Sequence, residues 1–441
     1  MGGILADDMG LGKTVQVLSY LLAMKQNGQT LPSLIVCPAS LVLNWAEECR
    51  KFTPELNCVV VDGDAAHRAQ LAEQWDGADV VVTSYDLLRR DETLYESQKF
   101  YACILDEAQA IKNHTTQKYK AVCGVNSRVR FALTGTPVEN RLGELWSIFS
   151  FLMPGYLPPY KSFCSRFEKP IVQEEDQTAV RRLNQLTGPF ILRRMKSDVL
   201  KELPPKTENV YRIELEEEQR KLYLAAVVDA REKLQAAKPE DKMAVFAVLM
   251  RLREICCDPR LIADNWTGGS AKLDACIELV TSAVESGHRI LLFSQFTSML
   301  ELLAKRLDAE GVSHFTLQGS TPKPVRAELV RRFNGGEASV FLISLRAGGT
   351  GLNLTAADIV IHYDPWWNVA AQNQATDRAY RIGQQNPVQV YKLIAQDTIE
   401  EKIVELQQAK QDLAETVTGS ADGAILRMKP EELLNLLEGT E

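Results

Sequence analysis

Short apolar runs, each followed by a stretch with helical spacing of apolar residues, recur along most of the chain. In the first part the runs lie at 34–37, 58–62, 79–83, 102–105 and 130–133, and the rhythm restarts at 289–293, 313–317, 339–344, 359–363 and 388–393. The runs are nearly continuous rather than alternating, which is typical of parallel strands covered on both faces. The pattern therefore predicts an α/β fold of two successive β/α units, each built on a parallel sheet.

Two helices are predicted with particular clarity. Between the first two strands Leu41, Trp45, Cys49 and Phe52 fall on one helical face, and Ser40 is placed to cap that helix. After the last strand, apolar residues at positions 399, 403, 406, 413 and 417 keep helical spacing. We therefore expect one long helix to end the second unit.

The strand rhythm breaks between residues 154 and 266, where prolines precede charged, helix-like sequence at 214–238 and 245–257. This predicts a mostly helical insert between the two units. The expected domains are lobe one at 1–153, the insert at 154–266, lobe two at 267–418, and a linker (419–423) with a short terminal helix (430–437) at 419–441.

Composition narrows the class of protein. Nine cysteines are scattered without a C-x-x-C pair and the five histidines do not cluster near them, which argues against zinc or a disulfide framework and favours a reducing compartment. No apolar run approaches the roughly 20 residues that cross a bilayer, and no signal peptide is visible, so no membrane partner is expected. The net charge of -8 excludes a wholly basic nucleic-acid coat but not a local basic cleft.

A glycine-rich segment near the start is a candidate phosphate-binding loop. The strict pattern is G-x-x-x-x-G-K-[ST]; Gly12, Lys13 and Thr14 match it, but Asp7 occupies the first glycine position. Gly10 and Gly12 would let backbone N–H groups turn toward phosphate oxygens, Lys13 would reach the terminal phosphates, and Thr14 would ligate Mg²⁺. The alternative is a glycine-rich turn with an ordinary surface lysine.

A carboxylate pair follows the apolar strand at 102–105. Asp106 and Glu107 would stand at the carboxyl end of a parallel strand, where open α/β sheets bind ligands. Asp106 suits Mg²⁺ held through water, and Glu107 suits polarisation of an attacking water. The alternative is a solvated acidic strand end.

Two further segments follow strands. The segment TGTP at 134–137 carries small hydroxyl residues that could sense a nucleotide, although a simple turn fits nearly as well. A second glycine-rich loop, SLRAGGTGLN at 344–353, lacks a lysine–threonine pair, so it is not a second ATP loop. Its backbone N–H groups could grip a DNA phosphate.

Arginines near the end of the chain are candidates to complete the site. Arg378 and Arg381 are three residues apart, which makes them neighbours on one helical face if the segment is helical. Guanidinium groups suit the charge that develops on a transferring phosphoryl group, and an arginine finger contributes about 10³–10⁵ in rate. Taken alone, these residues favour an exposed basic helix.

Three other features are ambiguous. Trp366 and Trp367 fit core packing and nucleic-acid contact about equally. The segment LRRMK at 192–196 could contact phosphate, although charge runs are more often solvated faces, and Cys256 with Cys257 is a buried helical pair without assigned chemistry.

The ordered set of motifs resembles the Swi/Snf-type ATPases of helicase superfamily two through nearly the whole chain. The motifs that carry the resemblance are DDMGLGKTVQ (7–16), PASL (38–41), DEAQ (106–109), LTGTP (133–137), LRR (192–194), CCDP (256–259), FSQF (293–296), the 346–354 loop, DPWWN (364–368) and QATDRAYRIGQ (374–384). The last is the most specific, because it separates this family from strand-opening relatives. Aspartate in place of the first loop glycine is what the family shows.

The resemblance implies two RecA-like lobes with helical protrusions, ATP and Mg²⁺ as cofactors, and a set of site residues. The implied catalytic residues are Lys13, Asp106, Glu107, Arg378 and Arg381, with Thr14 and Asp106 on Mg²⁺. The implied nucleotide-binding residues are Asp8, Gly10, Gly12, Lys13, Thr14, Gln16, Gln109, Gly349 and Gln374. The implied nucleic-acid contacts are Ser40, Arg346, Gly348, Trp366 and Trp367.

The implied activity is DNA-stimulated ATP hydrolysis coupled to tracking along double-stranded DNA, displacing or repositioning bound proteins such as nucleosomes or RNA polymerase. The alternatives are a helicase that separates DNA or RNA strands and, less favoured, a non-hydrolysing scaffold on a protein–DNA complex. The compact insert and the absence of a nuclear-localisation cluster favour a bacterial cytoplasmic protein, nuclear if eukaryotic. Since the family normally carries adenine-contacting sequence before the loop, which here begins at residue 2, we expect an N-terminally truncated chain with weakened nucleotide affinity.

Overall fold

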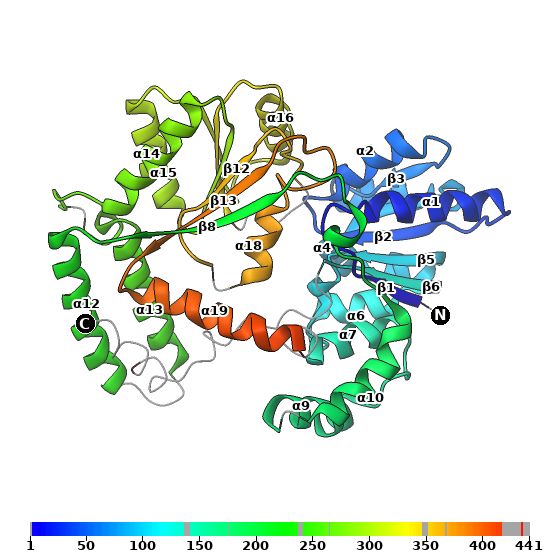
Figure 1. The fold of residues 1–441 in the computed structure, drawn as a ribbon. Coiled ribbons are helices and arrows are strands. Elements are labelled where there is room, and N and C mark those ends of the chain that lie inside the picture. Colours follow the sequence, from blue (N-terminus) through cyan, green and yellow to red (C-terminus); the bar gives the residue numbers. More distant parts are fainter. Residues whose placement is uncertain are drawn as a thin grey trace. The chain divides into compact units, whose positions relative to one another are not determined.

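The computed structural model describes residues 2–135, 142–174, 176–236, 241–263, 265–345, 352–366, 368–416 and 434. The chain divides into two compact units, Met1–Lys201 and Glu202–Thr416. Each unit is built on its own sheet, and the strand pairs among the described residues are parallel. The predicted fold class, two parallel-sheet α/β lobes in tandem, is therefore confirmed (Figure 1).

Unit 1 contains a seven-stranded sheet in the order β3-β4-β2-β5-β6-β1-β7. The strands are β1 (Gly2–Leu5), β2 (Ser33–Cys37), β3 (Cys58–Val60), β4 (Val80–Ser84), β5 (Lys99–Asp106), β6 (Asn126–Leu133) and β7 (Ile191–Leu192). Alternate residues of the central strands enter two separate apolar cores: Leu34 and Val36 pack on one face, Ile35 and Cys37 on the other. Both faces are buried, which is why these strands read as continuous apolar runs.

The helices of unit 1 cover these faces. They are α1 (Lys13–Gln26), α2 (Val42–Phe52), α3 (Ala65–Ala72), α4 (Tyr85–Arg90), α5 (Glu92–Ser97), α6 (Gln117–Gly124), α7 (Leu142–Leu152), α8 (Tyr160–Phe163), α9 (Lys169–Gln173), α10 (Gln177–Thr187) and α11 (Lys196–Val199). In α2, Trp45 and Cys49 are buried as predicted, but Phe52 is 45% exposed and lies beneath the ammonium of Lys51. The capping prediction is also wrong, because Leu41 occupies the N-cap and no side chain caps the helix.

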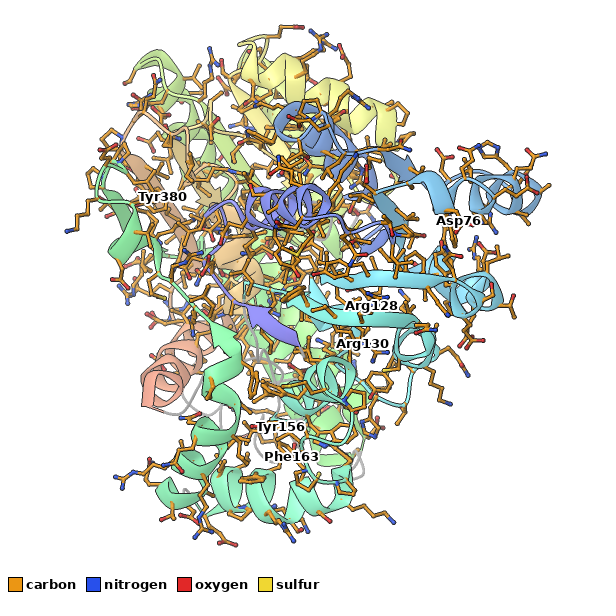
Figure 2. The ribbon with its side chains drawn as sticks, turned by 90° about the vertical axis from the view of Figure 1, so that its right-hand side faces the viewer. Asp76, Arg128, Arg130, Tyr156, Phe163 and Tyr380 are labelled. Carbon is orange, nitrogen blue, oxygen red and sulfur yellow. The ribbon has the colours of Figure 1, made fainter. Side chains whose placement is uncertain are left out.

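Arg130 fastens one end of unit 1 together. It lies on β6 beside Arg128 on the same strand (Figure 2), and its guanidinium donates to the carbonyls of Phe151, Val125 and Cys123 at 2.8, 3.0 and 3.2 Å. The same group lies over the Phe151 ring, 5.1 Å from its centroid. The charge of Arg130 is thus satisfied by carbonyls at the ends of α6 and α7.

Unit 2 contains a six-stranded sheet in the order β10-β11-β9-β12-β13-β8. Its strands are β8 (Lys206–Ile213), β9 (Ile290–Ser294), β10 (His314–Leu317), β11 (Val340–Ser344), β12 (Ile359–His362) and β13 (Val388–Ala395), and its helices are α12 (Glu217–Ala236), α13 (Lys242–Cys257), α14 (Ala271–Glu285), α15 (Thr297–Ala309), α16 (Lys323–Asn334), α18 (Val369–Thr376) and α19 (Ile399–Thr416). Two apolar cores again occupy the two faces of the sheet. A third core joins α12, α13 and α19.

The stretch predicted as a helical insert contributes to both units. Its helices include α8 to α13, but it also holds β7, which joins the first sheet beside β1, and β8, which joins the second beside β13. The predicted closing helix corresponds to α19, while the linker and terminal helix predicted for 419–423 and 430–437 lie outside the described residues, Leu434 excepted. Among the helices the structure describes, none combines the length and apolarity needed to span a bilayer.

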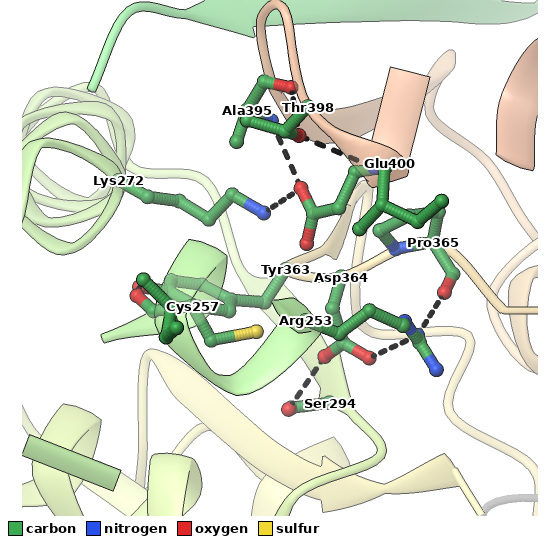
Figure 3. A network of polar contacts seen from close by, with 12 residues as sticks. Arg253, Cys257, Lys272, Ser294, Tyr363, Asp364, Pro365, Ala395, Thr398 and Glu400 are labelled. Carbon is green, nitrogen blue, oxygen red and sulfur yellow. Dashed lines mark hydrogen bonds and ion pairs between the residues drawn. The ribbon is translucent and has the colours of Figure 1, made fainter. Parts of the chain in front are cut away.

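Buried charges hold the core of unit 2 (Figure 3). Lys272 pairs with Glu400 and Arg253 pairs with Asp364, and all four side chains are 0% exposed. Ser294 donates to Asp364 at 2.6 Å, Arg253 also donates to the carbonyl of Pro365, and the amide of Ala395 donates to Glu400 at 2.9 Å. The network joins α13 and α14 to the last residues of β9 and β13, to the segment after β12 and to the start of α19.

Candidate functional site

The glycine-rich loop has the backbone that a phosphate-binding loop needs. It follows β1, and Gly10 and Gly12 have φ values of 87° and 75°, which an L side chain rarely adopts. Gly12 is the N-cap of α1 and no side chain caps it. The amino end of a 14-residue helix is therefore open to an anion, as the sequence predicted.

Lys13 is directed into this loop. Its ammonium donates to the backbone carbonyls of Asp7 and Asp8 at 2.6 and 3.3 Å. Burial lowers the pKa of Lys13, and the charges of Glu107 and Asp106 oppose that shift. Because the residue is half-buried and faces two carboxylates from β5 and its end, it is not an ordinary surface lysine.

Asp7 anchors the loop and is fully buried. The guanidinium of Arg194 donates to both of its carboxylate oxygens at 2.5–3.1 Å, the amide of Arg194 donates at 3.0 Å, and Gln16 donates at 3.2 Å. Arg194 also donates to Gln16 at 2.5 Å. Burial raises the pKa of the Asp7 carboxyl, but these hydrogen bonds and the arginine charge outweigh it, so the pKa is lowered overall.

The segment at 192–196 runs alongside the loop like a strap. The amide of Ala6 donates to Leu192 at 2.7 Å, that of Asp8 to Arg194 at 3.0 Å, and that of Lys196 to the Asp8 carboxylate at 3.0 Å. Arg194, which belongs to the segment predicted as a possible phosphate-contacting patch, thus binds Asp7. Sequence reasoning did not identify Arg194 as a site residue, although the LRR motif pointed to this segment.

Asp106 ends β5 with its carboxylate held on both sides. Its Oδ2 accepts from the indole N–H of Trp45 at 2.8 Å, and its Oδ1 accepts from the amide of Glu107 at 2.9 Å. Burial, followed by the charge of Glu107, raises the pKa of Asp106 to about 7. The residue as a whole is half-buried rather than enclosed, so a ligand can still approach it.

Glu107 has left-handed backbone angles, φ 49° and ψ 57°, which cost a non-glycine residue about 1–3 kcal/mol. Its Oε2 accepts from Gln109 at 2.7 Å, and Gln109 in turn accepts from the Thr134 hydroxyl at 3.1 Å. The structure thus brings together Glu107 and Gln109 of the DEAQ motif with Thr134 of the LTGTP motif. Thr136 and Pro137 lie outside the described residues.

The oxygen donors of unit 1 fit Mg²⁺. Thr14 is half-buried in the first turn of α1, and Asp106 retains acceptor capacity beyond its two hydrogen bonds. Nowhere in the described residues do three His, Cys, Asp or Glu side chains gather as a metal cluster. Mg²⁺ is commonly held by one or two protein oxygens together with substrate phosphates and water, so this donor set suits it better than a metal with an all-protein cage.

The candidate arginines of unit 2 do not lie on a helix face, contrary to prediction. Helix α18 ends at Thr376, and Arg378 and Arg381 occupy the turns that follow. Arg378 is 2% exposed within unit 2, whereas Arg381 is partly exposed and donates to the Leu352 carbonyl at 3.4 Å. The two residues are therefore not equivalent.

Gln384 holds these turns in place. Its amide nitrogen donates to the carbonyls of Ala357, Ala379 and Thr355 at 2.7, 3.1 and 3.3 Å, and its amide oxygen accepts from two following backbone amides at 2.9 Å. All of this polar side chain is used internally. It is a positioning residue that the motif contained and sequence reasoning did not single out.

The remaining predicted residues have mixed outcomes. Ser40 is half-buried after β2, and Gln374 lies in α18 with partial exposure. Trp366 is partly buried against an apolar core of unit 2, as the packing alternative requires. Four predicted residues lie outside the described residues: Arg346, Gly348, Gly349 and Trp367.

Comparison with known proteins agrees with this set of motifs. The family model of the SNF2-related domain matches residues 1–261, and that of the helicase conserved C-terminal domain matches residues 271–383. A solved structure, the SWI2/SNF2 ATPase core of Sulfolobus solfataricus in complex with double-stranded DNA, is 35% identical and covers 99% of this chain and 92% of that one, with a TM-score of 0.47.

Longer bacterial proteins are also similar. MG018 of Mycoplasma genitalium, named an uncharacterized ATP-dependent helicase, is 39% identical over 442 residues, covering 99% of this chain and 42% of that protein. YwqA of Bacillus subtilis, which carries the name of an ATP-dependent helicase/translocase, is 40% identical over 446 residues, covering 99% and 48%. The chain spans less than half the length of these relatives, and it belongs to the SNF2-related family.

Proposed function

We propose that this chain is a DNA-stimulated ATPase that tracks along double-stranded DNA and displaces or repositions bound proteins. The observation that carries the proposal is the assembly at the amino end of α1. There an uncapped helix end, the half-buried ammonium of Lys13 and the two carboxylates of Asp106 and Glu107 converge. Clustered charges with shifted pKa values at strand ends are typical of catalytic sites.

Each side chain has a distinct role. Backbone N–H groups around Gly10 and Gly12 hold the phosphates, with Asp8, Gln16 and Gln109 around the loop, and Lys13 leaves its carbonyl partners to contact the terminal phosphate. Thr14 and Asp106 hold Mg²⁺, which when bound neutralises charge on the phosphate oxygens. Glu107, fixed by Gln109, orients the attacking water and accepts its proton.

Unit 2 supplies the remaining charge. Arg381 is the better candidate for the finger, because Arg378 is almost fully enclosed in its own unit. We assign Arg378 the role of supporting the turn that carries Arg381, alongside Gln384 and with Gln374 nearby on the same motif. ATP can couple hydrolysis to movement only through a difference in its contacts before and after hydrolysis, and we assign that difference to Lys13 and Arg381.

Duplex tracking is favoured over strand separation by the family assignment and by the QATDRAYRIGQ motif at 374–384. Ser40 is proposed to touch the DNA backbone from unit 1, and Arg346 and Gly348 of the 346–354 loop and the tryptophan pair from unit 2. A strand-separating helicase with the same ATP chemistry remains the second candidate, because the similar bacterial proteins are named helicases.

The test is ATP turnover measured with no nucleic acid, with duplex DNA, with single-stranded DNA and with RNA, alongside a strand-separation assay and a triplex-displacement assay. The proposal expects strong stimulation by duplex, triplex displacement and no strand separation. Preference for RNA with unwinding would replace it by the second candidate. No hydrolysis under any condition would overturn it.

A further inference from the structure

The indole of Trp45 reaches from helix α2 to the carboxylate that ends β5. Trp45 is 1% exposed, and its Nε1–H donates to Oδ2 of Asp106 at 2.8 Å. The helical spacing of apolar residues in α2 predicts that Trp45 packs in the core, and Trp45 does belong to an apolar core. The hydrogen bond adds a second role, because a buried N–H that meets a carboxylate makes a strong, directional contact.

Trp45 sets the orientation of that carboxylate. The other oxygen of Asp106 accepts only from the adjacent amide of Glu107, and the Asp106 carbonyl accepts from the hydroxyl of Tyr85 at 2.8 Å. Within the described part of the chain no other side chain donates to the Asp106 carboxylate. Without the indole N–H, the carboxylate would therefore lose the one side-chain contact that holds Oδ2 in place.

The same tryptophan is tied directly to the segment at 38–41. Helix α2 begins at Val42, and the amide of Trp45 donates to the carbonyl of Leu41 at 2.9 Å. Leu41 in turn donates to the carbonyl of Pro38 at 2.8 Å, which closes the segment into a tight turn. Ser40 lies in that turn, half-buried, and its hydroxyl makes no hydrogen bond to any residue that the structure describes. The turn therefore reaches the surface, and a single backbone hydrogen bond, from Trp45 to Leu41, links it to Trp45.

We propose that Trp45 is a positioning residue that holds Asp106 for Mg²⁺ and transmits contact at the 38–41 turn to that carboxylate. A phosphate bound on the turn would act on the start of α2, and through it on the indole that holds Oδ2 of Asp106; Asp106 would in turn hold Mg²⁺. The inference rests on the proposed function and gives it a physical route by which DNA stimulates hydrolysis.

The chain offers a matched control. Trp75 is 2% exposed in the same unit and packs against Tyr95 and Phe100, with ring centroids 4.9 and 6.0 Å away. Its buried indole N–H has no hydrogen-bond partner within the described residues. Trp75→Phe therefore removes the same atoms as Trp45→Phe without removing a hydrogen bond to a carboxylate.

The first measurement needs no turnover. Binding of a fluorescent ATP analogue is titrated with Mg²⁺ in the wild-type chain, Trp45→Phe and Trp75→Phe, and the indole N–H signals are followed by ¹⁵N NMR. We expect the Mg²⁺ concentration for half-maximal binding to rise about 10-fold in Trp45→Phe only, since a hydrogen bond to a charged group is lost. The signal absent from Trp45→Phe should shift on Mg²⁺–nucleotide addition in the wild type.

The second measurement is ATP turnover with and without duplex DNA at saturating Mg²⁺. We expect Trp45→Phe to lose most of the stimulation of kcat while KM for ATP stays within about twofold, and Trp75→Phe to behave as wild type. Equal Mg²⁺ dependence and equal stimulation in the two variants would overturn the inference. If the wild type hydrolyses no ATP, the proposed function fails instead, and the Mg²⁺ titration still decides whether Trp45 positions Asp106.

Discussion

The two units use the same kinds of charged side chain in opposite ways. In unit 1, Lys13, Asp106 and Glu107 stay partly exposed and bond mainly to backbone groups, an amide side chain and an indole. In unit 2, Lys272 with Glu400 and Arg253 with Asp364 pair directly and are 0% exposed. A buried, paired set of charges fixes a structure, whereas a set of partly exposed charges without direct ion pairs is available to a ligand.

The presence of a carboxylate at the end of a strand therefore does not by itself indicate a catalytic site. Asp106 ends β5 and Asp364 follows β12, and burial raises the pKa of both carboxyls. Asp364 is enclosed by Arg253 and Ser294, while Asp106 keeps solvent contact beside Lys13. Exposure and the identity of the partner separate the two roles.

The largest expected effect is on catalysis in unit 1. Glu107→Gln removes the group that accepts the proton of the attacking water, so kcat for ATP should fall about 10²–10⁴-fold. Nucleotide binding and thermal stability should stay near wild type, because the amide keeps the shape and the contact with Gln109. Glu328→Gln, an exposed substitution in unit 2, is the control. Turnover that survives Glu107→Gln would show that the base is another residue.

The next effect is on the stability of unit 2. Lys272→Met leaves the buried carboxylate of Glu400 without its ion pair, so the free energy of unfolding should fall by about 3–5 kcal/mol. Denaturant unfolding followed by circular dichroism measures it. The double change Lys272→Met with Glu400→Gln should recover much of the loss, since no uncompensated charge remains.

Lys221→Met is the control for that experiment, because Lys221 pairs with glutamates on an exposed helix face. It should unfold like the wild type. If the Lys272→Met chain were as stable as this control, the buried ion pair of unit 2 would not contribute to stability.

A smaller effect is expected where the strap meets the loop. Arg194→Ala removes the bidentate contact with Asp7 that anchors the loop and should weaken ATP binding. The loss should be only about 10-fold, because the arginine is partly exposed and its charge is screened by solvent. Equilibrium binding of a fluorescent ATP analogue measures the change. Arg193→Ala, an exposed neighbour in the same segment, should bind as the wild type does. Equal affinity in both variants would mean that Asp7 needs no anchor.

The smallest predicted effect concerns pH. Burial lowers the pKa of His362 from 6.5 to about 3, and its Nε2 contacts the Thr376 hydroxyl at 2.9 Å. Between pH 6.5 and 3 the unfolded chain therefore binds a proton at His362 that the folded chain does not bind. The free energy of unfolding is not reduced by this proton above pH 6.5, and it declines as the pH falls toward 3. The loss amounts to about 1 kcal/mol between pH 6.5 and 5.5. Unfolding measured at both values should show this decline in the wild type and less of it in His362→Phe; identical slopes would contradict it.

The sequence predicted much of the fold because ten strands are continuous apolar runs. It missed β1, β7 and β8 for different reasons: β1 is half glycine, β7 has two residues, and β8 is an edge strand whose first seven residues are exposed. Strands of this kind acquire their structure from a neighbour rather than from a pattern of their own.

The candidate site was predicted as far as local motifs reach. The loop glycines with Lys13, and the carboxylate pair of Asp106 and Glu107, each lie within a few residues of one another. Short motifs of this kind can be recognised in the sequence. The partners of Asp7 and Asp106 lie 187 and 61 residues away, and no helical or strand period links them. The turn geometry at Arg378 and Arg381 was missed because their three-residue spacing suits a helix, yet α18 ends before them.

The proposed function requires that Arg381 stabilise the charge that develops on the phosphate contacted by Lys13. The most direct measurement is kcat of Arg381→Ala at saturating ATP and duplex DNA, with nucleotide affinity and unfolding measured in parallel. The account predicts a loss of about 10³-fold or more in kcat with the fold intact. Turnover close to the wild type would contradict it.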